Sequence, residues 1–197
     1  MVLPYGLGGL GKLLKYVDVI GDGNCGFRVV ADYVYGDHNM SGLTRRNIAN
    51  KLACNRDLYK RLSTDGIDQT IARIRWERGS CTSGHWIQVA NDLFLIATLL
   101  NTAIILLQGG TSSKSRRGSY TVFPLHASEL DTRRLIEMVT LNLGSYSHFI
   151  RLNLASNFPV PPIVTMWFRD MDHNVASCDR LYDNRREQWD RLSAASV

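Results

Sequence analysis

The sequence contains no closely spaced pair of cysteines. Its four cysteines stand far apart in a chain of 197 residues, at Cys25, Cys54, Cys81 and Cys178. Zinc knuckles and redox motifs depend on cysteines separated by two residues, so neither kind of site is indicated. Scattered, unpaired cysteines are typical of reduced thiols, and we therefore expect an intracellular protein of the cytoplasm or nucleus.

The sequence also lacks an unbroken apolar run that could span a membrane. The longest apolar stretch, residues 93–107, is interrupted by Thr98, Asn101 and Thr102. A spanning helix needs about 20 predominantly apolar residues. The N-terminus has no charged start, which does not fit a signal peptide. We expect no association with a membrane.

A strong excess of charge of one sign is absent as well. The net charge is +5 at pH 7, with 21% charged and 45% hydrophobic residues, which is typical of a globular protein. The basic residues are mostly dispersed, so nucleic acid is not an indicated partner. Lys114, Arg116 and Arg117 cluster within residues 109–118, a polar stretch more typical of a solvated loop than of a nuclear-targeting or anion-binding patch.

The expected secondary structure places helices first and strands later. Helices are predicted at 25–35, 45–62, 68–75 and 85–101, and strands at 16–20, 103–107, 120–125, 138–143 and 148–154. The last two strands read as a hairpin, with His148, Ile150, Leu152 and Leu154 on one face. This order predicts an α+β fold, arranged as an α/β/α sandwich with a small central sheet flanked by helices.

A change of composition divides the chain near residue 155. We expect a domain over residues 1–155 and a separate C-terminal segment over residues 156–197. Pro159, Pro161 and Pro162 predict an extended linker. The charged stretch beyond it predicts a tail or a peripheral helix.

The most informative segment is residues 21–28, Gly-Asp-Gly-Asn-Cys-Gly-Phe-Arg. It places Cys25 at the start of a predicted helix, where unpaired N–H groups and the helix dipole favour the nucleophilic thiolate. Glycines on both sides let a substrate backbone approach. The N–H groups of Gly23, Asn24 and Cys25 are candidates for an oxyanion hole. An inert core cysteine is the alternative, and it suits the other three cysteines better.

A histidine is needed to take the thiol proton, and His148 is the first candidate. It opens a predicted strand directly after the turn 144–147, so it projects from a rigid edge. A structural histidine in a hairpin is the alternative. The remaining histidines lack this setting; they are His38, His85, His126 and His173.

A Cys–His pair usually needs a third polar group that fixes the imidazole. Ile150, two positions after His148, cannot do this, and Asn153 falls on the opposite face by alternation. Asp22 is the best remaining carboxylate, because it lies on the same turn as Cys25. It could support His148 or cap its own turn, and both roles could hold.

These segments resemble the motifs of the OTU (ovarian-tumour) cysteine proteases. Residues 22–28 resemble the nucleophile motif of that family, and Ser147-His148-Phe149 is similar to its histidine motif. Residues 85–97 and 103–107 look like its tryptophan-bearing helix and the strand that follows. The likeness covers roughly residues 17–154. The residues after Cys25 and the stretch 159–163 look more like OTU domains associated with transposable elements.

The resemblance implies a papain-like fold and a deubiquitinase that cleaves isopeptide bonds of ubiquitin, of polyubiquitin chains or of a ubiquitin-like protein. It implies Cys25 as the nucleophile, His148 as general base and then acid, and Asp22 as the third member, with no metal or other cofactor. Many relatives carry Asn or Asp where this chain has Ile150, so the third member stays open. The alternative is a catalytically weak or inactive ubiquitin-binding or scaffold domain derived from a mobile element.

Overall fold

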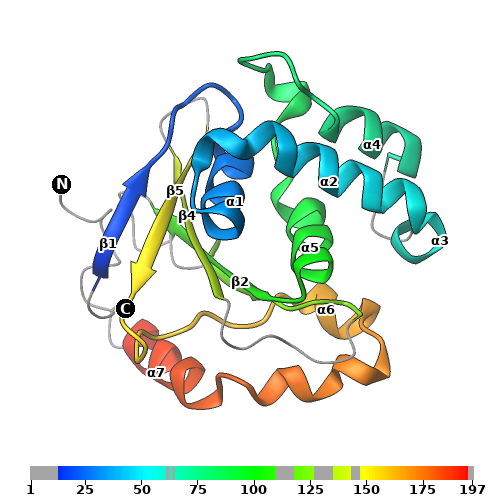
Figure 1. Ribbon diagram of the computed structural model, residues 1–197. Coiled ribbons are helices and arrows are strands. Elements are labelled where there is room, and N and C mark those ends of the chain that lie inside the picture. Colours follow the sequence, from blue (N-terminus) through cyan, green and yellow to red (C-terminus); the bar gives the residue numbers. More distant parts are fainter. Residues whose placement is uncertain are drawn as a thin grey trace.

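The middle layer of the protein is a mixed β-sheet, seen in the computed structural model of Figure 1. The structure describes residues 13–60, 63, 65–109, 118–126, 135–142 and 147–194. The basic cluster at 114–117, discussed above, lies outside these ranges. Within them the sheet has five strands: β1 Leu13–Asp18, β2 Ala103–Gly109, β3 Tyr120–Val122, β4 Leu135–Asn142 and β5 Ser147–Leu154.

The strands lie in the order β1-β5-β4-β2-β3. Neighbours β2 and β4 are parallel, and the other three neighbouring pairs are antiparallel. The predicted pairing of the last two strands is confirmed, because β4 and β5 are antiparallel with Met138 opposite Arg151. The sheet therefore pairs β1 with β5, although they lie far apart in the sequence, and this pairing determines which side chains of the two strands meet.

Helices cover both faces of the sheet. The α-helices are α1 Cys25–Tyr35, α2 Ser41–Cys54, α3 Arg56–Tyr59, α4 Ile67–Ile74, α5 Val89–Leu100, α6 Thr165–Asp170 and α7 Asp183–Ala194. Short 3₁₀ helices lie at His38–Met40, Ser83–His85 and His173–Arg180. Together these layers give the α+β, α/β/α arrangement that the sequence predicted (Figure 1).

The larger core lies between the sheet and helices α1, α2 and α5. Phe27 of α1, Leu52 of α2 and Phe94 of α5 are fully buried there. They pack in one cluster with Ile104 and Leu106 of β2. Burying apolar surface on this scale is the main stabilising contribution in a domain of this size, and it fixes α1 against the sheet.

The opposite face of the sheet is covered by the C-terminal part of the chain. Ile105 of β2 and Ile150 of β5 pack there with Phe158 and with Trp189 of α7. Figure 1 shows α7 across the sheet from α1. The apolar face predicted by alternation along β5 is confirmed for Ile150, Leu152 and Leu154. Residues 156–194, which the composition separated from the domain, thus form a layer of the same fold.

The proline-containing stretch is fixed to the edge of the sheet. The N–H of Thr121, in β3, donates to the carbonyl of Pro162 at 2.8 Å, and the N–H of Val164 donates to the carbonyl of Thr121 at 3.0 Å. The Thr121 hydroxyl also donates to the carbonyl of Pro161 at 2.8 Å. Proline can lie on a sheet edge because its missing N–H is not needed there.

Two helix boundaries show what the local sequence determines. The predicted helix at 25–35 is confirmed, and it ends at Gly36, which has a left-handed φ of 71°. The helix predicted from residue 85 begins instead at Val89. The reason is Asp92, whose carboxylate accepts the N–H of Gln88 at 2.8 Å and so caps the helix at that point.

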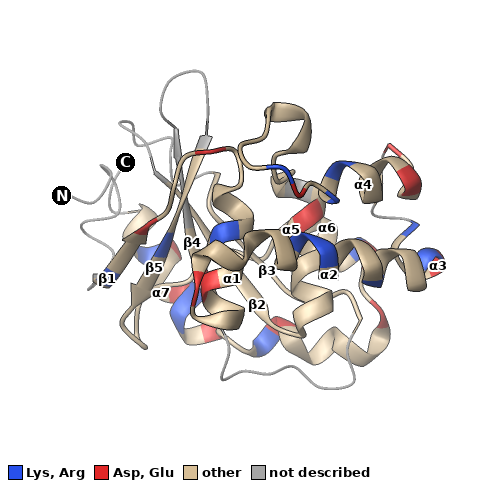
Figure 2. Cartoon of the chain, turned by 45° about the horizontal axis from the view of Figure 1, so that its top comes forward, with Lys and Arg blue, Asp and Glu red and all other residues tan. Residues whose placement is uncertain are grey.

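Charged residues are interspersed over the described chain. Figure 2 shows basic and acidic residues mixed along the helices and strands. Several form ion pairs: Arg46 with Glu77 at 3.1 Å, Arg56 with Asp68 at 2.7 Å and Arg169 with Asp170 at 2.7 Å. The dispersion of charge expected from the composition is therefore present in these parts of the fold.

Candidate active site

Asp22 organises the turn that precedes α1. Its carboxylate accepts the backbone N–H of Asn24 at 3.0 Å and the guanidinium of Arg28 at 2.7 Å. Burial opposes ionisation of Asp22, but the hydrogen bonds from Arg28 and Asn24 outweigh it and lower the pKa to about 2. Asp22 is therefore a carboxylate at neutral pH. It has the turn-capping role predicted for it, and it holds the chain in shape just before the helix.

Cys25 is the first residue of α1 and is buried, with 7% of its surface exposed. Burial raises the pKa of its thiol, and the N–H groups of Phe149 and Gly26 oppose this only in part. The thiolate expected from the helix start is thus opposed by desolvation. A thiol in this setting needs a base to remove its proton. The contact with Phe149 brings strand β5 directly against the sulfur.

His148 lies next to that contact, on β5. Its ring Nε2 is 2.8 Å from Oδ1 of Asp18, the last residue of β1. The other ring nitrogen, Nδ1, faces the turn, because a Cβ placed on Gly21 would lie 3.6 Å from it. The ring therefore lies between a carboxylate and the turn that carries Cys25.

Two glycines of the turn are needed for packing. Gly23 has a φ of +82°, and a Cβ there would lie 2.2 Å from the carbonyl oxygen of Cys81. A Cβ on Gly26 would lie 2.5 Å from Ile87. Both glycines let residues 81–87, the segment before α5, approach residues 21–26. We call residues 21–26 the nucleophile turn, after the role predicted for Cys25. The approach of a substrate backbone at these glycines stays a prediction.

Arg45 of α2 binds the turn through the side chain of Asn24. Its guanidinium is fully buried, donates to Oδ1 of Asn24 at 2.9 Å and lies over the ring of Phe27 at 3.9 Å. It also donates to the carbonyl of His85 at 2.9 Å. Burial lowers the pKa of Arg45 to about 10, so the group stays charged at neutral pH. One side chain thus joins the nucleophile turn to the segment before α5.

A second arginine fixes the other end of that segment. Arg73 binds the carboxylate of Asp92 through two hydrogen bonds of 2.8 and 2.6 Å, and it donates to the carbonyl of Trp86 at 2.9 Å. Asp92 is 1% exposed. Bidentate arginine–carboxylate pairs are rigid, so Trp86 has a fixed position. The indole Nε1 of Trp86 donates to the carbonyl of Cys81 at 3.3 Å.

A cleft opens over these groups. Its walls come from β1, the nucleophile turn, the segment before α5 and the start of β5, and its lining residues include Asp18, Asp22, Cys81, Trp86 and His148. Cys25 closely follows residues 21–23, the part of the nucleophile turn that forms one wall of this cleft.

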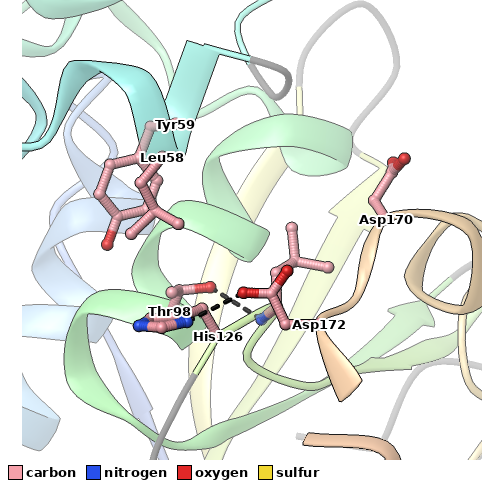
Figure 3. Close-up of a pocket in the computed structure, with 7 residues that line it drawn as sticks. Leu58, Tyr59, Thr98, His126, Asp170 and Asp172 are labelled. Carbon is pink, nitrogen blue, oxygen red and sulfur yellow. Dashed lines mark hydrogen bonds and ion pairs between the residues drawn. The ribbon is translucent and has the colours of Figure 1, made fainter. Parts of the chain in front are cut away.

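The other histidines have different partners. Nδ1 of His85 is 2.9 Å from the carbonyl of Arg73. His126 and Asp172 form a second histidine–aspartate pair, with Nδ1 3.0 Å from the carboxylate. Figure 3 shows this pair at a small pocket beneath Leu58 and Tyr59, where the seven lining residues include no cysteine. His126 therefore has no cysteine among the residues of its pocket.

Cys25 and His148 stay the predicted catalytic pair, and the structure adds a contact that the sequence did not indicate, between His148 and Asp18. The carboxylate on the imidazole is that of Asp18, whereas Asp22 contacts its own turn and Arg28. The Asn24 N–H, a predicted oxyanion donor, is occupied by Asp22 in this structure. Asp18 lies within the predicted strand 16–20, shortly before the turn, and that position is the available signal. The sequence predicts Arg45 in an amphipathic helix and gives no sign of its burial.

Some kinds of site are not found in the described residues. The ranges given above contain no group of three or more His, Cys, Asp and Glu side chains that could hold a metal ion. None of the helices in those ranges combines the length and apolar character of a membrane span.

The chain resembles known proteins in parts of its sequence and in its fold. No family model matches the sequence. OTU domain-containing protein 5-A of Danio rerio is 31% identical over 90 residues, or 46% of this chain and 15% of that protein. OTU domain-containing protein 5 of Homo sapiens is 28% identical over 108 residues, or 55% of this chain and 18% of that protein. The chain thus spans less than a fifth of the length of these relatives.

Two solved structures have the same architecture. The OTU domain of OTUD1 is 20% identical, with a TM-score of 0.50, and the match covers 70% of this chain and 84% of that domain. The viral OTU domain protease from Qalyub virus is 14% identical, with a TM-score of 0.52 over 72% of this chain and 84% of that one. The chain therefore has the fold of the OTU family.

Proposed function

We propose that this protein is a thiol-dependent deubiquitinase, with Cys25 as the nucleophile and His148 as the general base and acid. The observation that supports this most strongly is the ring of His148, which lies between the Asp18 carboxylate and the turn of Cys25. The fold adds support, since the similar structures are OTU domains and one of them is a protease. The cleft beside the ring provides space for an extended chain end.

The reaction begins with proton transfer from the Cys25 thiol to Nδ1 of His148. The sulfur then attacks the carbonyl carbon of the isopeptide bond, and the imidazolium gives its proton to the leaving lysine amine. Water, deprotonated by the same imidazole, attacks the thioester and releases the carboxylate of ubiquitin and the free thiol. Because the buried thiol has a raised pKa, the proton transfer by His148 is essential to this reaction.

The oxyanion of the tetrahedral intermediate needs N–H donors near the sulfur. Gly23 and Cys25 remain as candidates from the three predicted donors, since the N–H of Asn24 is bonded to Asp22. Removing one such donor typically costs about 10²–10³ in kcat. Asp22 serves this step by holding the turn, without contact with the reacting atoms.

Ubiquitin, alone or as polyubiquitin, is the partner that this function requires, and a ubiquitin-like protein is the related possibility. The decisive test uses ubiquitin that carries an electrophile at its C-terminus. We expect the wild-type protein to form a covalent adduct at Cys25 and to cleave di-ubiquitin. The Cys25→Ala and His148→Ala variants should lose both activities while remaining folded.

Matched controls separate chemistry from unfolding. Cys54 is exposed on α2, so Cys54→Ala should keep wild-type activity. His126→Ala should also keep it, because His126 lies at the separate pocket of Figure 3. Cleavage by Cys25→Ala would exclude the proposed mechanism. Binding of ubiquitin by the wild type without adduct or cleavage would instead identify a binding domain.

A further inference from the structure

The carboxylate of Asp18 on β1 contacts the imidazole of His148 on β5. Asp18 of β1 pairs with Ile150 of β5, and directly paired residues of antiparallel strands point to the same face. Ile150 and His148 share that face because they are two positions apart. Asp18 and His148 are thus diagonal neighbours across the strand pair. Their side chains are in hydrogen-bonding contact, with 2.8 Å between Oδ1 of Asp18 and Nε2 of His148.

This contact selects one tautomer of the imidazole. A carboxylate accepts hydrogen bonds only, so the proton lies on Nε2. In the neutral ring Nδ1 is then the basic nitrogen, and Nδ1 is the atom that faces the turn of Cys25. When the ring becomes an imidazolium, the charge of Asp18 stabilises it. Both effects act on the proton transfer from the thiol.

Two residues of β5 beyond His148, Ile150 and Asn153, offer no group for this purpose. Ile150 is 4% exposed and packs in the apolar cluster beneath α7. Asn153 is exposed and lies on the other side of β5. Asp22 is bonded to Arg28 and Asn24. Among these candidates only Asp18 touches the ring.

We propose that Asp18 is the positioning residue of this site: it holds the His148 ring with Nδ1 toward Cys25 and stabilises the imidazolium. This inference rests on the proposed function. Asp18 is the third polar group beside Cys25 and His148, a group that Ile150 and Asn153 of β5 do not supply. The carboxylate comes from the neighbouring strand, at the position directly opposite Ile150.

The exposure of Asp18 separates this role from a structural one. Its side chain is 52% exposed, whereas that of His148 is 12% exposed. An ion pair with an exposed partner adds little to folding stability. Replacing Asp18 should therefore leave the fold intact and change the reactivity of Cys25. A mainly structural residue would change the unfolding temperature instead.

The test measures Cys25 directly. The wild type, Asp18→Ala, Asp18→Asn and the control Asp190→Asn, which changes an exposed carboxylate on α7, are treated with iodoacetamide at pH 7. Mass spectrometry of the peptide that contains Cys25 gives its rate of alkylation. The same proteins are assayed for kcat and KM on a fluorogenic ubiquitin substrate, and for unfolding temperature.

We expect Asp18→Ala to slow alkylation of Cys25 and to lower kcat by about 10- to 100-fold, with KM nearly unchanged. This is less than the roughly 10⁴-fold loss seen when a buried triad carboxylate is neutralised, because water screens Asp18. Asp18→Asn keeps an acceptor without the charge, so it should fall between Asp18→Ala and the wild type. Asp190→Asn should match the wild type.

Failure of the role of Asp18 and failure of the proposed function give different results. Alkylation of Asp18→Ala at the wild-type rate, with the protein folded, would overturn the role of Asp18. A wild type that does not cleave ubiquitin, but whose Cys25 alkylation still slows in Asp18→Ala, would remove the proposed function and leave Asp18 as the positioning residue of the histidine. If Asp18→Ala unfolds, Asp18→Asn provides the comparison, and equal rates there would also overturn the proposal.

Discussion

The guanidinium of Arg45 donates to the side-chain oxygen of Asn24 at 2.9 Å, with both residues buried. This bond links the middle of α2 to the residue directly before the nucleophile. Arg45 also donates to the carbonyls of Ile74 and His85, so one cation joins three segments. Planar guanidinium groups suit such divergent acceptors because their N–H groups point in fixed directions.

Arg45→Lys should therefore be costly although it keeps the charge. An ammonium cannot reach all these acceptors, and each buried acceptor left without a partner costs about 1–3 kcal/mol. We expect a loss of about 2–4 kcal/mol in the free energy of unfolding by urea denaturation, together with slower alkylation of Cys25. Arg46→Lys is the neighbouring control, because Arg46 is exposed and pairs with Glu77. Equal stability of the two variants would show that Arg45 is not a central support.

Gly23→Ala tests the close approach between the nucleophile turn and the segment before α5. Gly23 combines a φ of +82° with a Cβ position 2.2 Å from a Cys81 oxygen, so alanine must displace the backbone there. Gly36→Ala is the control, since Gly36 has a similar φ of +71° but nothing within 4 Å of its Cβ position. We expect a loss of about 1 kcal/mol for Gly36→Ala from backbone strain alone.

Gly23→Ala should lose at least twice that and should also lose most of its ubiquitin cleavage. Thermal unfolding and a fluorogenic ubiquitin assay measure the two effects. A similar small cost for both variants, with activity kept, would mean that the contact with Cys81 yields easily and does not shape the site.

The site was partly predictable because some of its signals are local. The turn that carries Cys25, the start of α1 and its end at Gly36 all follow from neighbouring residues. The pairing of β1 with β5 joins residues about 130 positions apart, and no local pattern gives its register. Asp18 could not be assigned to His148 for this reason. The burial of Arg45 likewise depends on α2 packing over the turn.

The C-terminal segment illustrates the same limit. Three prolines favour an extended chain, and an extended chain fits a linker as well as a sheet edge. Only the contacts with Thr121 show that it runs along β3. A charged helix with one buried tryptophan resembles a peripheral helix until its partners on the sheet are known.

Asp22→Asn tests the cap of the turn through its dependence on pH. The folded pKa of Asp22, about 2, lies below the usual value of 3.8. Between these values the unfolded chain binds more protons, so this carboxylate adds stability above about pH 4 and loses it as the pH falls through 2. The shift corresponds to about 2 kcal/mol. Asp22→Asn should lack this part of the rise in stability between pH 2 and 4.

Urea denaturation at several pH values measures that slope, and Asp190→Asn should retain it. At neutral pH Asp22→Asn should also lower kcat, because the turn loses its ion pair with Arg28. Asn153→Ala, which changes an exposed residue of β5, should leave kcat unchanged. An unaltered pH slope in Asp22→Asn would show that the bond to Arg28 contributes no stability.

The last prediction concerns Trp189, which is 3% exposed on α7. It packs against the apolar face formed by β2 and β5, the strand of His148. The carbonyl of Arg185 on α7 accepts the N–H of Val160 at 3.1 Å, which ties the helix to the proline-containing stretch. Removing a buried tryptophan side chain typically costs about 3–5 kcal/mol. Trp189→Ala should therefore lower the free energy of unfolding by that amount, measured by urea denaturation. Leu181→Ala is the control, because Leu181 is 37% exposed.

Deletion of residues 156–197 should have a larger effect, since it exposes Ile150 and its neighbours on the sheet to water. A fragment of residues 1–155 that stays soluble and reacts with the ubiquitin probe as fast as the full chain would mean that the C-terminal layer is a dispensable tail.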